Sequence, residues 1–127
     1  MKVIIAGGRD FNNREVAFKC LDKRMWSKGD VIVSGHASGA DALGEEYAKA
    51  HGLDIDLHPA NWREYGRAAG PIRNREMAEV ADKLIAFWDG KSRGTKNMIS
   101  EAKEKGLCVV VYDYGGNRRK GKSDERD

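Results

Sequence analysis

The amino-acid sequence predicts an α/β domain, a three-layer α/β/α sandwich built around a parallel sheet of about five strands. The first observation behind this prediction is that short apolar runs alternate with longer segments whose apolar residues recur at helical spacings. Strands that alternate with helices in this way form parallel sheets with right-handed crossovers. The second observation is that the apolar runs are almost unbroken, which indicates strands covered by helices on both faces of the sheet.

The predicted strands are the apolar runs at 2–6, 31–34, 83–88 and 107–112 and a short third strand at 53–57, bounded by Pro59. Apolar runs of this length, bounded by glycine, proline or polar residues, are typical of buried strands. We predict the strand order 3-2-1-4-5, which places the first strand in the middle of the sheet and makes a topological switch point beside it.

Four helices are predicted between these strands. Glycine follows three of them, at Gly29, Gly52 and Gly106, and is expected to end them. The segment 60–70 is rich in aromatic and basic residues and is expected to be irregular. Phe18, Leu21 and Met25 are expected to form the apolar face of the first helix. The helices are expected at 13–27, 40–51, 71–80 and 95–105.

The chain of 127 residues has the length of one domain, and its charge is concentrated at the carboxyl end. Residues 115–127 contain five basic and three acidic residues, which leaves only +1 of the net charge of +3 on the rest of the chain. We therefore predict a domain over 1–114 and a charged, flexible tail over 115–127. Because the body is nearly neutral, nucleic acid is a less favoured partner than a small molecule.

Two cysteines, Cys20 and Cys108, are expected to be buried free thiols. They form no CxxC pair and no zinc-binding spacing with histidine, so we expect neither a metal site nor a disulfide. A reducing compartment, the cytoplasm, fits this pattern. No apolar run approaches the ~20 residues of a membrane-spanning helix, and the first residues do not resemble a signal peptide.

Three glycine-bearing loops follow the first, second and fourth predicted strands: GGRD at 7–10, SGHASGAD at 34–41 and DGKSRGT at 89–95. Ligands of open parallel sheets bind outside the carboxyl ends of the strands. Glycine lets the backbone approach a phosphate, and the following helix offers free N–H donors. We therefore predict a phosphate-bearing, nucleotide-like ligand. The alternative is that the glycines only make tight turns. Neither the dinucleotide-binding fingerprint nor the Walker A pattern is present.

The candidate ligand residues lie in these loops or carry groups that bind phosphate. Arg9, Arg73 and Arg75 are candidate phosphate forks or, alternatively, part of a solvated surface. Asp41 either anchors a ribose hydroxyl or lies at a helix start because the helix dipole favours it there. The predicted ligand residues are Gly7, Gly8, Arg9, Ser34, Gly35, Ser38, Gly39, Asp41, Arg73, Asp89, Gly90, Ser92, Gly94 and Thr95.

Catalysis on a nucleotide would need a carboxylate to activate water or to stabilise an oxocarbenium-like centre. Asp89 is the first candidate and Asp10 the second. Trp62 and Tyr65 are candidates for stacking on a base, although they would equally cover a sheet edge or a subunit interface. Trp88 is expected in the core. Other carboxylates near the expected crevice are Glu46 and Glu76, and His36 is expected on the surface.

Four blocks of the sequence resemble the YspA-like family of the SLOG superfamily of Rossmann-like nucleotide-binding domains. The blocks are GGRDF (7–11), SGHASGADALGEEYA (34–48), NWREYGRAAGPIRNREMAEVAD (61–82) and AFWDGKSRGTKNMISEAKEKG (86–106), and the resemblance covers 1–112. It implies a Rossmann-like fold and the binding of ligands derived from nucleotides, such as NAD- or ADP-ribose-related molecules.

The resemblance also extends to other branches of SLOG. SGHASGAD resembles the SGxAxGxD loop of DNA-processing protein A, and Arg73-Asn74-Arg75 resembles its RNR block, which adds Asn74 to the predicted ligand residues. Residues 90–95 resemble the PGGxGT loop of the LOG, or lysine-decarboxylase-like, phosphoribohydrolases. Where those enzymes carry a catalytic glutamate, this chain has Asn97 and Met98, which argues against the same mechanism.

Three functions follow as hypotheses. The favoured one is a sensor, carrier or sponge that binds a nucleotide-derived ligand and requires no cofactor. The second is an N-glycosidic hydrolase or transferase, and the third is single-stranded DNA binding, by analogy with DNA-processing protein A. A homodimer or higher homo-oligomer is compatible with the resemblance and with the aromatic residues around Trp62.

Overall fold

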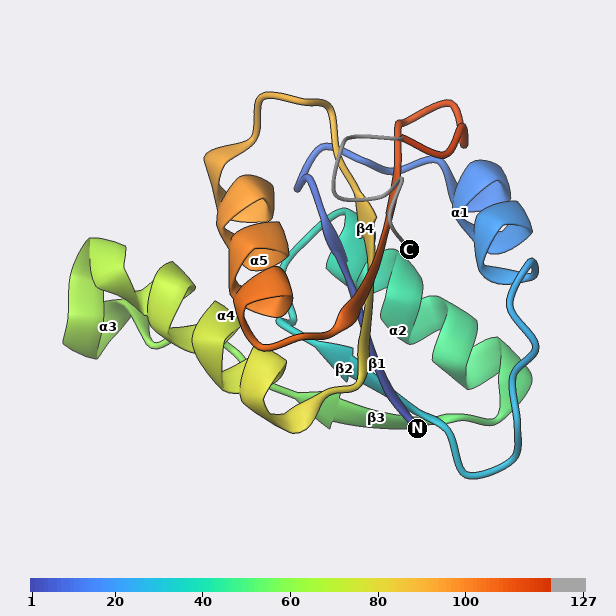
Figure 1. Ribbon diagram of the computed structural model, residues 1–127, viewed down its shortest axis with the longest axis horizontal. Helices are drawn as coiled ribbons and strands as arrows, with labels where there is room; N and C mark the ends of the chain where they lie inside the picture. Colours follow the sequence, from blue (N-terminus) through green and yellow to red (C-terminus); the bar gives the residue numbers. More distant parts are fainter. Residues whose placement is uncertain (120–127) are drawn as a thin grey trace.

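The computed structural model describes residues 1–119, which contain a five-stranded parallel sheet with the order β3-β2-β1-β4-β5 (Figure 1). This is the predicted strand order. The strand bounds lie within one residue of the predicted ones at both ends. The strands are β1 (Lys2–Gly7), β2 (Val31–Ser34), β3 (Asp54–Leu57), β4 (Lys83–Phe87) and β5 (Cys108–Tyr112).

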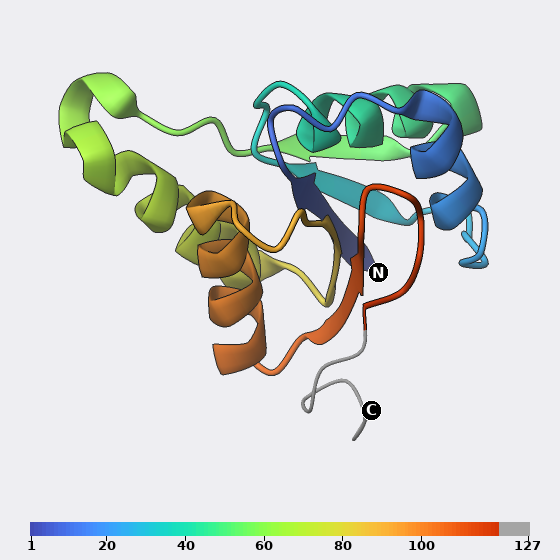
Figure 2. The ribbon, with the colours of Figure 1, turned by 90° about the horizontal axis from the view of Figure 1, so that it is seen from above.

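Helices cover both faces of the sheet, which confirms the predicted three-layer sandwich (Figure 2). On one face lie α1 (Arg14–Leu21) and α2 (Ala40–His51). On the other lie α4 (Ala69–Val80) and α5 (Arg93–Glu104). The short helix α3 (Trp62–Tyr65) precedes α4 and projects away from the sheet.

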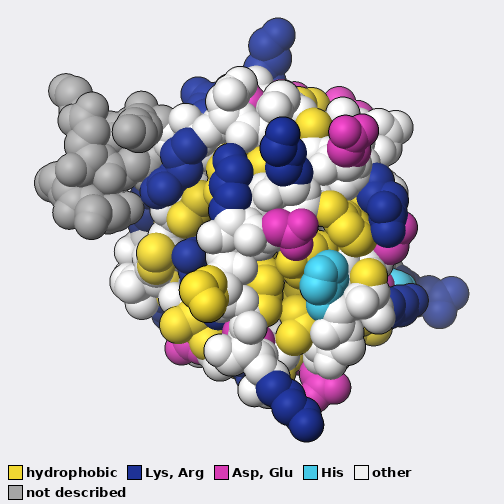
Figure 3. All heavy atoms as spheres, turned by 90° about the vertical axis from the view of Figure 1, so that its right-hand side faces the viewer, with side chains coloured by type: hydrophobic (Ala, Val, Ile, Leu, Met, Phe, Trp, Pro, Cys, Tyr) yellow, Lys and Arg dark blue, Asp and Glu magenta, His cyan; other side chains and the backbone are white. Residues whose placement is uncertain are grey.

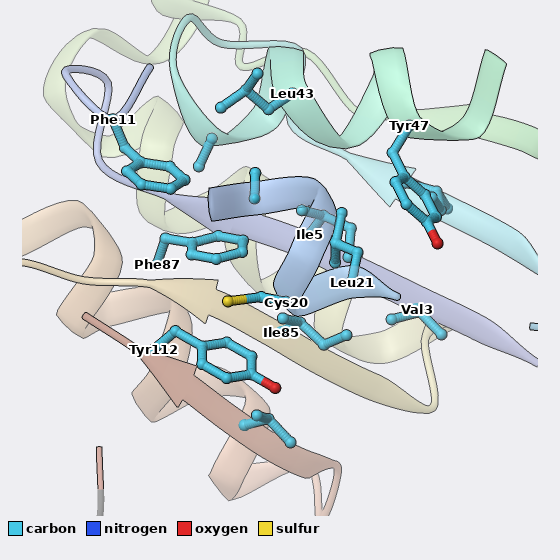
Figure 4. Close-up of a cluster of buried hydrophobic side chains, with 14 of the residues drawn as sticks. Val3, Ile5, Phe11, Cys20, Leu21, Leu43, Tyr47, Ile85, Phe87 and Tyr112 are labelled. Carbon is cyan, nitrogen blue, oxygen red and sulfur yellow. The ribbon is translucent and has the colours of Figure 1, made fainter. Parts of the chain in front are cut away.

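The core is divided by the sheet, because successive side chains of a strand point to opposite faces. From β1, Val3 and Ile5 pack with α1 and α2, whereas Ile4 and Ala6 pack with α4 and α5. Figure 4 shows the first of these clusters, in which Phe87 stacks on Phe11 with ring centroids 4.6 Å apart. All six of these side chains are at least 94% buried. This packing explains the unbroken apolar runs of the sequence.

The prediction of a first helix over 13–27 is wrong at its carboxyl end. The helix ends at Leu21, and Met25 is 90% exposed rather than part of an apolar face. Local hydrogen bonds hold the following loop instead. The indole N–H of Trp26 donates to the carbonyl oxygen of Leu21, and the buried carboxylate of Asp30 accepts from the backbone N–H of Ser27 and from Arg24.

The prediction of an irregular segment over 60–70 is also wrong. Residues 62–65 form α3, a 3₁₀ turn spans 66–68, and α4 begins at Ala69, two residues before Pro71. The side chain of Asn61 accepts a hydrogen bond from the backbone N–H of Glu64 and donates one to its carboxylate. This reciprocal pair stabilises the start of α3 in the manner of a capping box.

Two further expectations concern the cysteines and the carboxyl end. Cys20 is buried as expected, but Cys108 is exposed because it begins β5 at the edge of the sheet. At the start of the predicted tail, the N–H of Arg119 donates to Val111, and Arg118 forms a bridge with Tyr112. Arg118 and Arg119 thus pair with β5, and the rest of that segment, 120–127, lies outside the described residues.

The surface on the side of α1 carries Lys and Arg side chains interspersed with acidic and hydrophobic ones (Figure 3). None of the helices in residues 1–119 is long and apolar enough to cross a membrane.

Candidate functional site

A cavity of about 590 Å³ lies at the carboxyl ends of the strands, beside the topological switch point between β1 and β4. Its wall is formed by the β1–α1 loop, the start of α2, the α3–α4 segment and the β4–α5 loop. Twelve of the predicted site residues line it: Gly7, Gly8, Arg9, Asp10, Asp41, Trp62, Arg73, Asn74, Asp89, Ser92, Gly94 and Thr95.

A smaller cavity of about 300 Å³ adjoins the first. The two share Arg9, Trp62 and Arg73 in their walls, and the smaller cavity is also lined by Gly35 and Ser38. The three glycine-bearing loops therefore face one composite crevice. A third cavity of about 640 Å³ lies elsewhere, over β4 and β5 on the side of the sheet that α1 covers. None of the predicted site residues lines it.

The first loop is held against the neighbouring elements by backbone hydrogen bonds. The N–H of Gly8 donates to Phe87 at 3.1 Å, and its carbonyl oxygen accepts from Ala40, the first residue of α2, at 3.1 Å. A Cβ atom at Gly7, whose φ is 153°, would lie 2.3 Å from the carbonyl oxygen of Phe87. Glycine is required here because the loop passes directly over the end of β4.

The second loop is packed as closely. Gly39 has φ 75°, and a Cβ atom there would lie 2.3 Å from the carbonyl oxygen of Gly8. At Gly35, a Cβ atom would lie 2.3 Å from Nη1 of Arg73. The glycines at these positions thus satisfy packing between the loops, which is the alternative stated above. They also bring the loops close enough to share one crevice.

Arg73 is a half-buried guanidinium held by the protein itself. Its Nη1 donates to the carbonyl oxygen of Gly35 at 2.6 Å, and its Nε donates to Oδ1 of Asn74 at 2.9 Å. Burial lowers the pKa of Arg73, whereas the nearby carboxylate of Asp41 raises it. A guanidinium fixed in this way presents its remaining donors in a set direction.

Arg9 faces the same crevice from the first loop and is exposed. Its Cζ lies 5.5 Å from the centroid of the Trp62 ring, within cation–π range. Trp62 itself is 49% exposed and lines both cavities. The two side chains therefore form an exposed part of the wall, next to the half-buried Arg73.

Asp41 is the buried carboxylate of the site, with 5% of its surface exposed. It lies in the first turn of α2 and accepts a hydrogen bond from the backbone N–H of Ala37 at 3.2 Å. Burial raises the pKa of Asp41 to about 6, although the N–H of Ala37 and the charges of Arg73 and Arg9 act in the opposite direction.

The two carboxylates predicted as catalytic have partners within the protein. Asp89 is exposed and accepts hydrogen bonds from the backbone N–H groups of Lys91 and Ser92, both at 2.8 Å. These N–H groups lower the pKa of Asp89. Asp10 accepts a hydrogen bond from the hydroxyl of Tyr114 at 2.6 Å. Asp89 thus shapes the β4–α5 loop, and Asp10 fastens the first loop to the segment after β5.

The third loop leads into α5 through a side-chain cap. The hydroxyl of Ser92 accepts a hydrogen bond from the N–H of Thr95 at 3.3 Å and lies 3.1 Å from the hydroxyl of Thr95. Asn74 joins α4 to this region, because its amide donates to Oδ1 of Asn97 at 2.9 Å and to the carbonyl oxygen of Gly94 at 3.4 Å.

Some predicted site residues line neither cavity of the crevice: Ser34, Gly39, Gly90 and Tyr65. Ser34 is fully buried and donates to Glu45 at 2.7 Å. Tyr65 is 46% exposed on α3. Gly90, with φ 82°, is exposed in the loop that Asp89 shapes.

Other candidates are bound elsewhere. Arg75 pairs with Glu101 at 3.6 Å, Glu46 pairs with Arg14, and His36 lies 3.0 Å from Glu45. His36 does line the smaller cavity. In residues 1–119, no group of three or more His, Cys, Asp or Glu side chains is arranged to hold a metal ion.

Sequence reasoning missed some residues of the wall. Arg67 in the 3₁₀ turn and Gly70 and Met77 in α4 line the cavity, and they recur with the predicted Asn74 at spacings of three and four. That spacing is visible in the sequence and was hidden by the expectation of an irregular segment. Asn97, Met98 and Arg93 also line the cavity.

Comparison with known proteins agrees with this geometry. The model of the YspA, cpYpsA-related SLOG family matches residues 1–65. The chain is 33% identical over 119 residues to the Gene 61 protein of Mycobacterium phage D29, an alignment that covers 87% of this chain and 95% of that protein. No solved structure matches the chain. The chain belongs to the YspA, cpYpsA-related SLOG family.

Proposed function

We propose that the protein binds a nucleotide-derived, phosphate-bearing small molecule of the NAD or ADP-ribose kind in the composite crevice, as a sensor, carrier or sponge. The observation that carries the proposal is that Arg9 and Arg73 face one cavity together with three glycine-bearing loops. Membership of the SLOG family suggests binding or processing of nucleotide-related ligands and agrees with it.

The charges of the cavity wall favour an anion. Four arginines line it against three carboxylates, and each carboxylate accepts a hydrogen bond from the protein: Asp10 from the Tyr114 hydroxyl, and Asp41 and Asp89 from backbone N–H groups. Guanidinium groups bind phosphate through charge-assisted, often bidentate, hydrogen bonds. The arginines are Arg9, Arg67, Arg73 and Arg93.

The size and the aromatic wall favour a nucleotide over free phosphate. A cavity of about 590 Å³ lies within the range of small-molecule and cofactor pockets. Trp62 lies at the boundary between the two cavities and offers its ring for stacking on a base. Tyr65, the other predicted stacking residue, lines neither cavity.

Hydrolysis of an N-glycosidic bond receives less support. The carboxylates of Asp89 and Asp10 already accept hydrogen bonds from the protein, and the amide of Asn74 donates to Asn97, at a position where related phosphoribohydrolases carry their glutamate. Single-stranded DNA binding is also less supported, because the body of the chain is nearly neutral.

A melting panel tests the proposal. The protein is heated with NAD, ADP-ribose, cyclic ADP-ribose, AMP, nucleosides and short single-stranded DNA, and each mixture is then analysed by mass spectrometry. A ligand at 100 times its Kd stabilises the fold by about 2.7 kcal/mol. We expect a raised Tm with an unchanged phosphate-bearing nucleotide, lost in Arg9→Ala but kept in Arg63→Ala, an exposed arginine outside both cavities. No shift with any nucleotide would refute the proposal.

A further inference from the structure

We propose that Asp41 makes the site selective for ribose, by accepting a hydrogen bond from a hydroxyl of a ribose whose phosphate is bound by Arg9 and Arg73. This inference rests on the proposed function and adds the sugar to it. It assigns Asp41 a contact with the ligand and predicts that the ligand contains an intact ribose phosphate.

The cavity proposed to bind an anion also contains a buried carboxylate, Asp41. Asp41 lines the main cavity together with Arg9 and Arg73, and it is 5% exposed. A carboxylate beside a bound phosphate is unfavourable unless it forms interactions of its own, because like charges repel. A ligand that carries both a phosphate and hydroxyl donors satisfies guanidinium and carboxylate together, and a sugar phosphate is such a ligand.

The carboxylate of Asp41 can accept more hydrogen bonds than the described part of the chain supplies to it. Within residues 1–119, its carboxylate accepts one hydrogen bond, from the backbone N–H of Ala37 to Oδ2 at 3.2 Å. An ionised carboxylate has about four lone-pair sites. Asp41 can thus accept from a ligand hydroxyl without losing its bond to the loop. Asp10 and Asp89, the other carboxylates of the wall, also accept hydrogen bonds from the protein, but both are exposed, whereas Asp41 is buried.

The side chains of Asp41 and Arg73 lie close to each other, both beside Gly35. Both side chains pack on the same glycine: a Cβ atom at Gly35 would lie 2.3 Å from Nη1 of Arg73 and 2.8 Å from Oδ2 of Asp41. Arg73 is fixed there by its hydrogen bond to the carbonyl oxygen of Gly35. A guanidinium that can donate hydrogen bonds to a phosphate therefore lies beside a carboxylate that can accept one from a hydroxyl. A sugar phosphate carries both groups close together.

The charged groups around Asp41 keep it available. Arg9 faces it from the first loop and Arg73 from α4, and both favour its ionised form. Glu45 lies one turn further along α2 and opposes that form, but it is itself bound to the hydroxyl of Ser34 at 2.7 Å and lies 3.0 Å from His36. With a pKa of about 6, Asp41 is mostly ionised above neutral pH and accepts hydrogen bonds.

A purely structural role for Asp41 predicts a different result. Asp41 would then only stabilise the protein, through its hydrogen bond to Ala37 and its position in the first turn of α2. In that case replacement of Asp41 changes stability, and the protein does not distinguish ribose from deoxyribose. A site built to hydrogen-bond a hydroxyl rejects the analogue that lacks it.

The test is calorimetric titration of the intact chain with AMP, 2′-deoxy-AMP and 3′-deoxy-AMP. We expect at least one deoxy analogue to bind about 10- to 100-fold more weakly than AMP, as for a lost hydrogen bond to a charged group. Asp41→Asn should reduce AMP affinity and remove most of the difference between AMP and that analogue. Glu45→Gln, which alters the neighbouring carboxylate outside the cavities, should preserve the difference.

The outcomes separate the two proposals. Equal affinity of the wild-type protein for all three nucleotides overturns the ribose inference and leaves the proposed function intact. Binding of none of them, nor of NAD or ADP-ribose, overturns both. If Asp41→Asn does not fold, the comparison of AMP with its deoxy analogues in the wild-type protein decides the inference without it.

Discussion

Nη1 of Arg73 donates a hydrogen bond of 2.6 Å to the backbone carbonyl oxygen of Gly35, which joins α4 to the loop after β2. The two elements are 38 residues apart in the sequence, and this bond places a guanidinium at the wall shared by two cavities. The guanidinium of Arg73 therefore joins two segments of the protein and, in the proposed function, also binds the phosphate. A substitution that keeps the positive charge tests whether this planar geometry is needed.

Arg73→Lys is expected to weaken nucleotide binding although it keeps the positive charge. A lysine ammonium cannot hold Gly35 and Asn74 while also presenting two parallel donors to a phosphate. The expected loss is about 1.5–3 kcal/mol, as for a hydrogen bond to a charged group. Calorimetric titration with ADP-ribose measures it. The matched control is Arg75→Lys on the same helix, at an exposed residue that pairs with Glu101. Equal effects of both substitutions would contradict a special role for Arg73.

Trp62→Ala is expected to lower the affinity for a nucleotide by about 1–3 kcal/mol, the usual contribution of stacking on a base. Tyr65→Ala removes an aromatic ring of similar exposure from the same short helix, but one that lines neither cavity. Fluorescence titration of both variants with AMP compares them. A loss of affinity in Tyr65→Ala as large as that in Trp62→Ala would show that the cavity wall is not the stacking surface.

Gly39→Ala is expected to destabilise the fold by about 1–3 kcal/mol, the typical cost of a residue held in an unfavourable backbone region, or more. The φ of 75° and the contact of 2.3 Å with the carbonyl oxygen of Gly8 both disfavour a side chain. At Gly94, in the first turn of α5, a Cβ atom meets nothing within 4 Å. Gly94→Ala should therefore leave stability unchanged or raise it by up to about 1 kcal/mol. Urea denaturation distinguishes the two.

Because the pKa of Asp41 is raised in the folded protein, the free energy of unfolding is expected to depend on pH in a defined direction. The folded state holds this proton up to about pH 6, whereas the unfolded state releases it near the ordinary pKa of an aspartate, 3.8. The free energy of unfolding should therefore fall as pH rises from about 4 to about 6, by about 3 kcal/mol for a shift of about two pKa units. Asp30, Asp56, Asp89 and Asp113 have lowered pKa values, so their contributions change below that window.

Asp41→Asn removes this contribution and serves as its test. The difference in free energy of unfolding between variant and wild type should grow in favour of the variant as pH rises through the window. An amide oxygen can still accept from Ala37, so the loop keeps its hydrogen bond. A variant that is less stable than the wild type at pH 7, by the same amount as at pH 4, would refute the prediction. A gain in stability with a loss of binding is the usual sign of a functional residue.

The fold was predictable from the sequence because β1, β2, β4 and β5 are largely apolar on both faces. The run KVIIA indicates a strand buried on both faces, and β1 lies at such a position between β2 and β4. The loops of the crevice followed from this, since the carboxyl ends of parallel strands meet at one edge. Gly8, Gly35 and Gly94 lie in walls of the crevice as that argument required.

The roles of individual carboxylates were not predictable, because they depend on contacts between distant segments. The hydroxyl that binds Asp10 belongs to Tyr114, 104 residues further along the chain. The bonds to Asp89 are local, but they require the turn that the Ser92 cap forms. Asp41 is buried next to Gly35 of the second loop, on which Arg73 of α4 also packs. Arg67 was missed because the capping pair of Asn61 and Glu64 was not recognised as a helix start.

The central claim is that a phosphate-bearing nucleotide binds in the crevice formed by the three loops, and its most direct test is a map of backbone amide shifts. Uniformly ¹⁵N-labelled protein is titrated with ADP-ribose, and the amide resonances are followed by NMR. The account predicts the largest shifts at Gly8, Gly35 and Gly94, with none of similar size at Lys23 or Arg118 in the cavity over β4 and β5. Shifts confined to that other cavity would contradict it.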